Sequence, residues 1–122
     1  MNIGLADEAL GRYTEARPTL EHALAIYEKA LGPRHPAVAN GLSNLAGTLA
    51  SLGEIDAAEA AVERALSIQE EAFGPDHPSI AESLTLRAKL SRIRGDEDAA
   101  RRDEERAAAI RTRAKAPASE HE

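Results

Sequence analysis

Apolar residues along most of this chain recur every three or four positions, which is the spacing of one face of an α-helix. Two neighbouring stretches carry the pattern. The first has apolar side chains at Val38, Leu42, Leu45, Leu49 and Leu52. The second has them at Ile55, Ala58, Val62, Ala65, Leu66 and Ile68. The two-residue alternation of a half-buried strand is nearly absent, so the pattern predicts an all-α fold.

The sequence repeats itself with a period of 42 residues. The motif Gly-Pro-x-His-Pro occurs at residues 32–36 and again at residues 74–78. Glycines at 11, 53 and 95 keep the same spacing, and so do alanines at 16, 58 and 100. A fixed period of this size is typical of solenoids, in which repeated helical units stack side by side.

Glycines and prolines between the apolar stretches divide the chain into six predicted helices. Gly32, Gly53, Gly74 and Gly95 stand where a left-handed residue would end a helix, while Pro36 and Pro78 suit a first helical turn. The predicted helices span residues 2–10, 14–31, 37–52, 55–73, 79–94 and 97–114. They form a partial repeat (1–31), a full repeat (37–73) and a terminal repeat (79–114), followed by a disordered tail over 115–122.

The first and last units differ from the middle one. The first predicted helix has only ten residues before Gly11, and Asp7 stands where the middle unit has Leu49. In the last unit Ile55 becomes Glu97 and Val62 becomes Glu104. A polar last helix is what a terminal cap of a solenoid needs, although a partly disordered end would have a similar composition.

Composition and charge argue against several classes of protein. The chain has no cysteine, which excludes disulfides and thiolate metal sites, and its formal net charge of −6 argues against nucleic-acid binding. No apolar run approaches the roughly 20 residues of a membrane span, and the N-terminus lacks the order of a signal peptide. We therefore expect a cytoplasmic protein that binds neither nucleic acid nor membrane.

These features resemble the tetratricopeptide repeat, in its 42-residue kinesin-light-chain-like form. The middle unit matches the signature of that repeat at Leu45, Ala46, Leu49, Gly53, Ile55, Ala58, Val62 and Ala65. The resemblance covers about residues 2–112. It implies an α-α superhelix of about two and a half helix-turn-helix repeats. The first helix of each repeat would line a concave face.

Residues able to perform catalysis are present but not grouped for it. His35 and His77 lie one repeat apart without a further ligand at metal-binding spacing, so each is expected to pack or hydrogen-bond within its own turn. Ser43 and Ser51 have no partnered histidine and aspartate, and the Gly-Pro motifs lack the ending of a phosphate loop. We expect no enzyme activity, no cofactor and no metal site.

The polar residues on the predicted concave face are the candidate binding residues. In the full repeat they are Asn40, Ser43, Asn44 and Gly47, and in the terminal repeat they are Glu82, Thr85, Lys89 and Arg92. Asn2 is equivalent to Asn44 in the partial repeat. Asn40 and Asn44 lie four residues apart and could present amides to the backbone of a partner. Asn44 could instead hydrogen-bond within the stack of repeats.

Two functions therefore remain open. The first is a protein–protein interaction module that holds a peptide or protein segment in the concave groove. The second is self-association, because the shortened first repeat leaves an apolar edge that another copy or further upstream repeats could cover. That edge includes Leu20, Leu24 and Tyr27.

Overall fold

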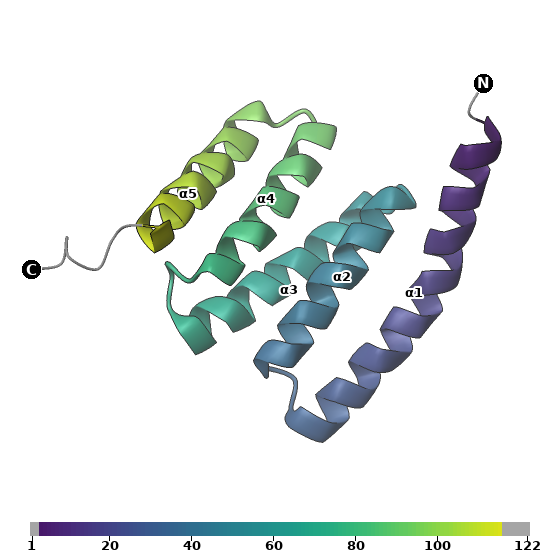
Figure 1. Ribbon diagram of the computed structural model, residues 1–122, viewed down its shortest axis with the longest axis horizontal. Coiled ribbons are helices and arrows are strands. Elements are labelled where there is room, and N and C mark those ends of the chain that lie inside the picture. Colours follow the sequence, from purple (N-terminus) through teal and green to yellow (C-terminus); the bar gives the residue numbers. More distant parts are fainter. Residues whose placement is uncertain (1–2, 116–122) are drawn as a thin grey trace, which may run out of the picture.

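The computed structural model describes the backbone of residues 3–115 and the side chains of residues 11–114. This part of the chain consists of five α-helices and contains no strand (Figure 1). Their bounds are α1 Ile3–Leu31, α2 Pro36–Ser51, α3 Ile55–Phe73, α4 Pro78–Ile93 and α5 Glu97–Lys115. The pairs α2–α3 and α4–α5 form two helical hairpins that stack side by side, and α1 lies against α2 (Figure 1). The prediction of an all-α helical solenoid is confirmed.

Four glycines end the helices or turns as predicted. Gly32, Gly53, Gly74 and Gly95 have φ angles of 98°, 83°, 86° and 88°, in the left-handed region that side chains disfavour. Each therefore reverses the chain at the end of a helix, which sets the two hairpins and the links between them.

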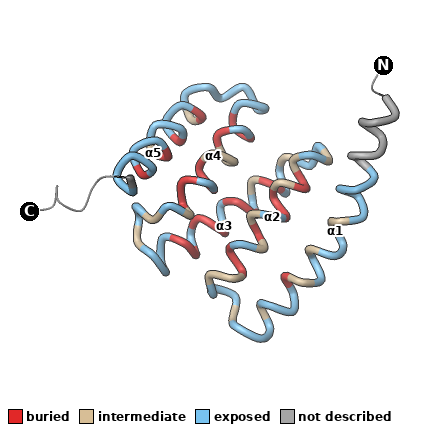
Figure 2. The backbone as a smooth tube through the Cα atoms, in the orientation of Figure 1, coloured by how far each residue is buried: buried red, intermediate tan, exposed pale blue. Residues whose placement is uncertain are grey.

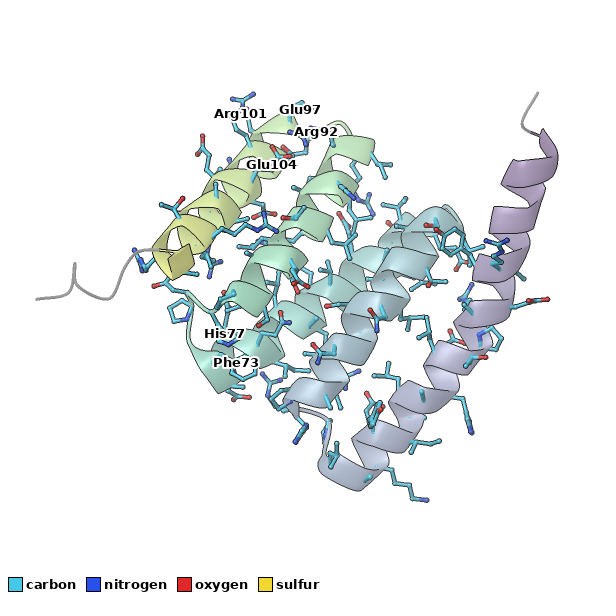
Figure 3. All side chains as sticks on the ribbon, in the orientation of Figure 1. Phe73, His77, Arg92, Glu97, Arg101 and Glu104 are labelled. Atoms are coloured by element: carbon cyan, nitrogen blue, oxygen red, sulfur yellow. The ribbon has the colours of Figure 1, made fainter. Side chains whose placement is uncertain are left out.

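The two histidines of the repeated motif cap the helices that come directly after them. His35 Nδ1 accepts a hydrogen bond from the backbone N–H of Ala37 at 3.0 Å, and His77 Nδ1 accepts one from Ser79 at 3.1 Å. Each histidine thereby satisfies one of the free N–H groups at a helix start. His77 also stacks on Phe73 with ring centroids 4.2 Å apart (Figure 3). The structural role predicted for these histidines is confirmed.

The buried residues form a thin layer between the helices rather than one central hydrophobic core (Figure 2). Val38, Leu42 and Leu49 of α2 are buried against the small residues Ala58 and Ala65 of α3. Alanines at these positions let the helix axes approach closely, so a chain with few aromatic residues still buries its apolar side chains.

The predicted break between residues 2–10 and 14–31 is wrong. The chain runs through Gly11 as one helix, α1, of 29 residues, and Pro18 lies inside it rather than near its start. A turn at Gly11 would fold the first segment back as α2 folds on α3. Asp7 would then occupy the position of Leu49, which is 3% exposed. Burying an unpaired carboxylate is costly, whereas a continuous helix keeps its backbone hydrogen bonds.

Helix α1 approaches α2 closely at one glycine. A Cβ atom at Gly41 would lie 3.1 Å from Cδ1 of Leu24, so the absence of a side chain there makes room for the leucine. Leu24 is buried in the main core and Leu20 packs against that core, so the prediction that Leu24 belongs to an open apolar edge is wrong. The C-terminal half of α1 is thus fixed to α2, which makes α1 a wall beside the concave face.

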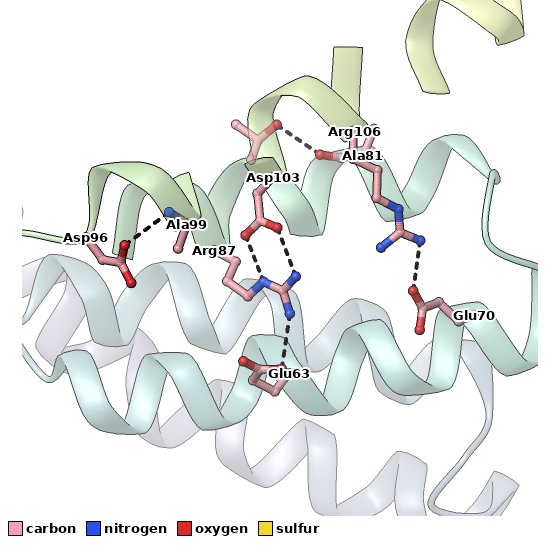
Figure 4. A network of polar contacts seen from close by, with 9 residues as sticks. Glu63, Glu70, Ala81, Arg87, Asp96, Ala99, Asp103 and Arg106 are labelled. Atoms are coloured by element: carbon pink, nitrogen blue, oxygen red, sulfur yellow. Dashed lines mark hydrogen bonds and ion pairs between the residues drawn. The ribbon is translucent and has the colours of Figure 1, made fainter. Parts of the chain in front are cut away.

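The terminal helix α5 is packed against α4. Ala100, Ala107 and Ile110 are at most 2% exposed. Arg87 of α4 holds Asp103 of α5 through two hydrogen bonds of 2.8 and 2.9 Å (Figure 4). The predicted terminal helix is therefore present. The predicted tail lies outside the described residues, apart from Lys115, which ends α5.

Candidate functional site

A hollow of about 450 Å³ lies between α1, α2 and α4. Four residues predicted for the groove line it, namely Ser43, Asn44, Gly47 and Lys89. The remaining lining residues are Tyr13, Thr48, Ala50, Ser51 and Leu86. The first helices of both complete repeats thus contribute to one concave surface, with α1 as its side wall.

A second hollow of about 320 Å³ adjoins the first between α1 and α2. Asn40 and Asn44 line it, and Asn44 belongs to both hollows. Its other walls are apolar or small and include Leu20, Ala23 and Gly41. The two hollows form a track that runs along α2 and is apolar on its α1 side.

The amides of Asn40 and Asn44 face solvent. Both residues are exposed, and neither forms a hydrogen bond with any residue whose side chain is described. The predicted alternative, a hydrogen bond from Asn44 within the stack, is therefore not among the contacts of residues 11–114. A side-chain amide carries two donors and an acceptor, so both groups are free to meet a peptide backbone.

Lys89 is the charged residue of the first hollow. Its ammonium is exposed and forms no ion pair with the described residues. It also lines a shallow hollow of about 380 Å³ together with Arg92 and Ile93, and Ile93 is 61% exposed. This end of the track therefore combines a free positive charge with an apolar surface.

Arg92 is less available than its position on α4 suggested. It donates hydrogen bonds of 2.5 and 2.8 Å to Glu104 and one of 3.0 Å to Glu97, both on α5 (Figure 3). The bonds to Glu104, and then the bond to Glu97, raise the pKa of Arg92. The same contact with Arg92 lowers the pKa of Glu104. The guanidinium is held by α5, so it contributes mainly to the hairpin.

Two other predicted residues, Glu82 and Thr85, line none of these hollows. The hydroxyl of Thr85 donates to the carbonyl of Ala81 at 2.9 Å and accepts from Arg111 at 3.2 Å. Glu82 is exposed on α4 and forms no bond with the described residues. Asn2 lies outside the described residues.

Tyr13 and Leu86 line the hollow although the sequence did not single them out. Tyr13 was expected in a turn next to Gly11, whereas the continuous α1 makes it part of the groove wall. Leu86 occupies the repeat position of Asn44. Its helical position facing the groove was the available signal.

The hydroxyl of Ser43 belongs to a polar chain between helices. It lies 3.4 Å from Ser83 Oγ, which donates to Gln69 Oε1 at 2.8 Å. This arrangement contains no base that could activate a serine nucleophile. Among the described residues no group of three or more His, Cys, Asp or Glu side chains could hold a metal ion. The described helices also include none with the length and apolar run that a membrane span requires.

Comparison with known families agrees with this geometry. The family model of the tetratricopeptide repeat matches the chain twice, over residues 1–71 and 38–113. A search of curated proteins found no match. Tetratricopeptide repeats generally mediate protein–protein interaction and are typically non-enzymatic scaffolds. Since the two matches cover most of the sequence, the chain belongs to the tetratricopeptide repeat family.

Proposed function

We propose that this chain binds a peptide or protein segment along the concave track formed by α2, α4 and α1. The observation that carries the proposal is the set of unpaired polar groups on that track: Asn40, Asn44 and Lys89 are exposed and lack partners among the described residues. Side-chain amides four residues apart on one helix face suit the spaced N–H and C=O groups of a bound backbone.

The lining residues also define the chemistry of the segment. Leu20 and Leu86 offer apolar contact, while Lys89 offers one positive charge near the α4 end. The complementary segment is apolar or neutral over most of its length and carries a carboxylate where it meets Lys89. A segment rich in lysine and arginine would place like charges at that point.

Binding to an array of peptides with a systematically moved acidic residue tests this proposal. We expect the double variant Asn40→Ala with Asn44→Ala to weaken binding of the selected peptides at least about ten-fold. The separate variant Lys89→Ala should have an effect of the same size, but only on peptides that carry the acidic residue. Thr112→Ala, a polar truncation at an exposed position of α5, is the matched control. Failure of every peptide to bind, or equal binding by all these variants, would remove the proposal.

Self-association at α1 is the second candidate function. Ile26 on α1 is 53% exposed, whereas Ile68 and Ile110 at the same repeat position are 0% and 2% exposed. An apolar side chain that is covered in two repeats and open in the third supports the interpretation that another helix covers it.

We also infer that the chain belongs to the kinesin-light-chain-like branch of the family. The 42-residue period and the two Gly-Pro-x-His-Pro turns support this placement. Both turns use the histidine as a helix cap, so the motif has a defined structural role in this longer repeat.

A further inference from the structure

One face of α1 is uncovered where its internal counterparts are buried. Four residues of this bare face, Ala16, Thr19, Ala23 and Ile26, correspond by register to Ala58, Ala61, Ala65 and Ile68 of α3. The α3 residues are 0–8% exposed because α2 covers them. Thr19 and Ile26 are exposed, while Ala16 and Ala23 are partly so. The equivalent face of α3 thus packs against an antiparallel helix, α2.

The bare face has the length of a helix contact. A shallow hollow of about 440 Å³ is lined by Arg12, Glu15, Ala16, Thr19 and Leu20. Leu20 also lines the hollow of about 320 Å³ that continues to Tyr27. Residues 12–27 of a helix span about 24 Å, which matches the 16 residues of α2.

We propose that the bare face is covered by α1 of a second copy, packed antiparallel across a two-fold axis. This inference deepens the second candidate function, and the bare face borders the peptide track at Leu20 and Ala23. The contact line of this pair, or seam, has the three- and four-residue steps of a coiled coil. Along it, Arg12, Thr19 and Ile26 alternate with Ala16, Ala23 and Ala30. In the antiparallel register Ile26 of one copy faces Ala16 of the other, and Thr19 faces Ala23, so large residues meet small ones.

Charges flanking the seam favour the same register. Glu15 and Lys29 lie on one flank of the bare face, and neither has an ion-pair partner among the described residues. Antiparallel packing brings Glu15 of each copy to Lys29 of the other, so the pair forms twice. On the opposite flank Leu20 meets its own counterpart. Apart from Arg12 at its end the seam is uncharged, which suits two molecules that each carry a net charge of −6.

Among the described residues, the other end of the array offers no equivalent face. On α5 the corresponding residues Ala100, Ala107 and Ile110 are already covered by α4. The outer side of α5 is exposed and rich in charge, including Arg101, Arg102 and Glu105. A head-to-tail contact would press the bare apolar face against these charges, whereas a two-fold contact joins two like faces.

Sedimentation velocity over concentrations from about 1 µM to about 1 mM tests the proposal. A single helix pair is a small interface, so we expect a reversible dimer with a dissociation constant in the range of about 10–100 µM. Ile26→Glu should weaken it at least ten-fold because a carboxylate would be buried without a partner. The helix content of the Ile26→Glu variant should stay unchanged, since the side chain faces solvent in the monomer. Ala25→Glu adds the same charge on an exposed position away from the seam and should leave the dimer intact.

The charges test the register separately. Glu15→Lys and Lys29→Glu should each weaken the dimer about two- to ten-fold, and the double variant should restore it. A dimer that resists Ile26→Glu, or whose double variant shows no rescue, overturns the antiparallel α1 pair while leaving self-association standing. A monomer throughout the concentration range overturns both. If such a monomer binds a peptide copying residues 36–52, the bare face accepts a helix other than α1 of a second copy.

Discussion

Two histidines perform a task that aspartate, serine or threonine usually performs. In each Gly-Pro-x-His-Pro turn the glycine reverses the chain, the histidine caps the next helix and the second proline occupies its first turn. His77 Nδ1 also lies 2.8 Å from the hydroxyl of Ser79. The motif is thus explained by helix capping and requires no ligand.

Replacing His77 separates capping from ring stacking. We expect His77→Ala to lower the free energy of unfolding by about 1–2 kcal/mol, since the N–H of Ser79 loses its acceptor. His77→Asn keeps an acceptor and should recover most of the loss, although it removes the ring stacked on Phe73. Urea unfolding followed by circular dichroism measures both. If the asparagine variant is as unstable as the alanine variant, stacking rather than capping is the main contribution.

Arg87 and Asp103 replace an apolar contact of the preceding repeat. By register they correspond to Leu45 and Ala61, which are both 8% exposed. The hydrogen bonds to Asp103 raise the pKa of Arg87, whose guanidinium also reaches Glu63 at 3.2 Å (Figure 4). The last hairpin therefore has a specific ion pair where the middle one has hydrophobic packing.

Substitution of this pair should show strong coupling. Arg87→Leu leaves the mostly buried carboxylate of Asp103 unpaired and should cost about 2–3 kcal/mol. Adding Asp103→Ala to that variant recreates the apolar contact of the middle repeat and should bring stability back to near the starting value. Equilibrium unfolding of the two single variants and the double variant measures the coupling. Additive effects would show that the two side chains act independently.

At the scale of elements, α1 is where the repeat pattern and the structure differ. Gly53 and Gly95 turn the chain with positive φ, whereas Gly11 at the same register lies within a helix. No atom outside its own helical surroundings lies within 4 Å of a Cβ built at Gly11. The same residue type at the same register thus takes two conformations, because a turn forms only where the two helices that it joins can pack against each other.

A pair of alanine substitutions tests the continuity of α1. Gly11→Ala should raise helix content and increase the free energy of unfolding by up to about 1 kcal/mol, because alanine favours a helix interior. Gly95→Ala should decrease it by about 1 kcal/mol or more, because its φ of 88° is strained for alanine. Thermal unfolding by circular dichroism compares the two. Destabilisation by both substitutions would mean that residue 11 forms a turn.

The sequence predicted four of the helices almost to the residue. The predicted ranges 37–52, 55–73, 79–94 and 97–114 became α2, α3, α4 and α5, since glycine, histidine and proline mark their ends. It failed at Gly11 because a repeat register contains no information on energy. A turn at Gly11 would bury the carboxylate of Asp7, and a straight helix avoids that cost. Local signals decide helix ends, whereas the fold of a shortened repeat depends on what packs against it.

The sequence predicted which face of the helices several candidate residues share, but not the contacts that those residues form. The register placed Ser43, Asn44, Gly47 and Lys89 on one side of the repeats, and they line one hollow. It could not foresee that Arg92 is held by Glu104, because that pairing depends on how α5 lies across α4. Spacing within one helix defines a face, while ion pairs between helices require the packed structure.

At the scale of the molecule, ion pairs repeat along the stack. Arg64 pairs with Glu28 and donates to the carbonyl of Pro33, and Arg106 does the same to Glu70 and Pro75 one repeat later. The pair Arg34–Glu71 recurs with its charges exchanged as Asp76–Arg113. These mostly exposed pairs contribute little individually, but their repetition keeps each hairpin in one register relative to the last.

The stability of each helix should therefore depend mainly on its contacts with neighbouring helices in the stack. Helix α1 packs against α2 and reaches α3 through the Glu28–Arg64 pair, whereas α2 packs against α1, α3 and α4. Loss of a contact at α1 mainly affects α2, while loss of a contact at α2 affects the middle of the array. Local opening should then be easiest at α1, even though its residues form a regular helix.

Hydrogen exchange of two leucine variants tests this distribution. Leu24→Ala removes the buried contact of α1 and should speed exchange about ten-fold or more within α1 while α4 and α5 keep their protection. Leu42→Ala opens a cavity in the central core and should cost about 2–4 kcal/mol, which should speed exchange in α2, α3 and α4 together. Mass spectrometry of peptides from each helix measures both patterns. If Leu24→Ala speeds exchange equally in α5, the chain unfolds as one cooperative unit. Covering the bare face of α1 would then stabilise the whole array.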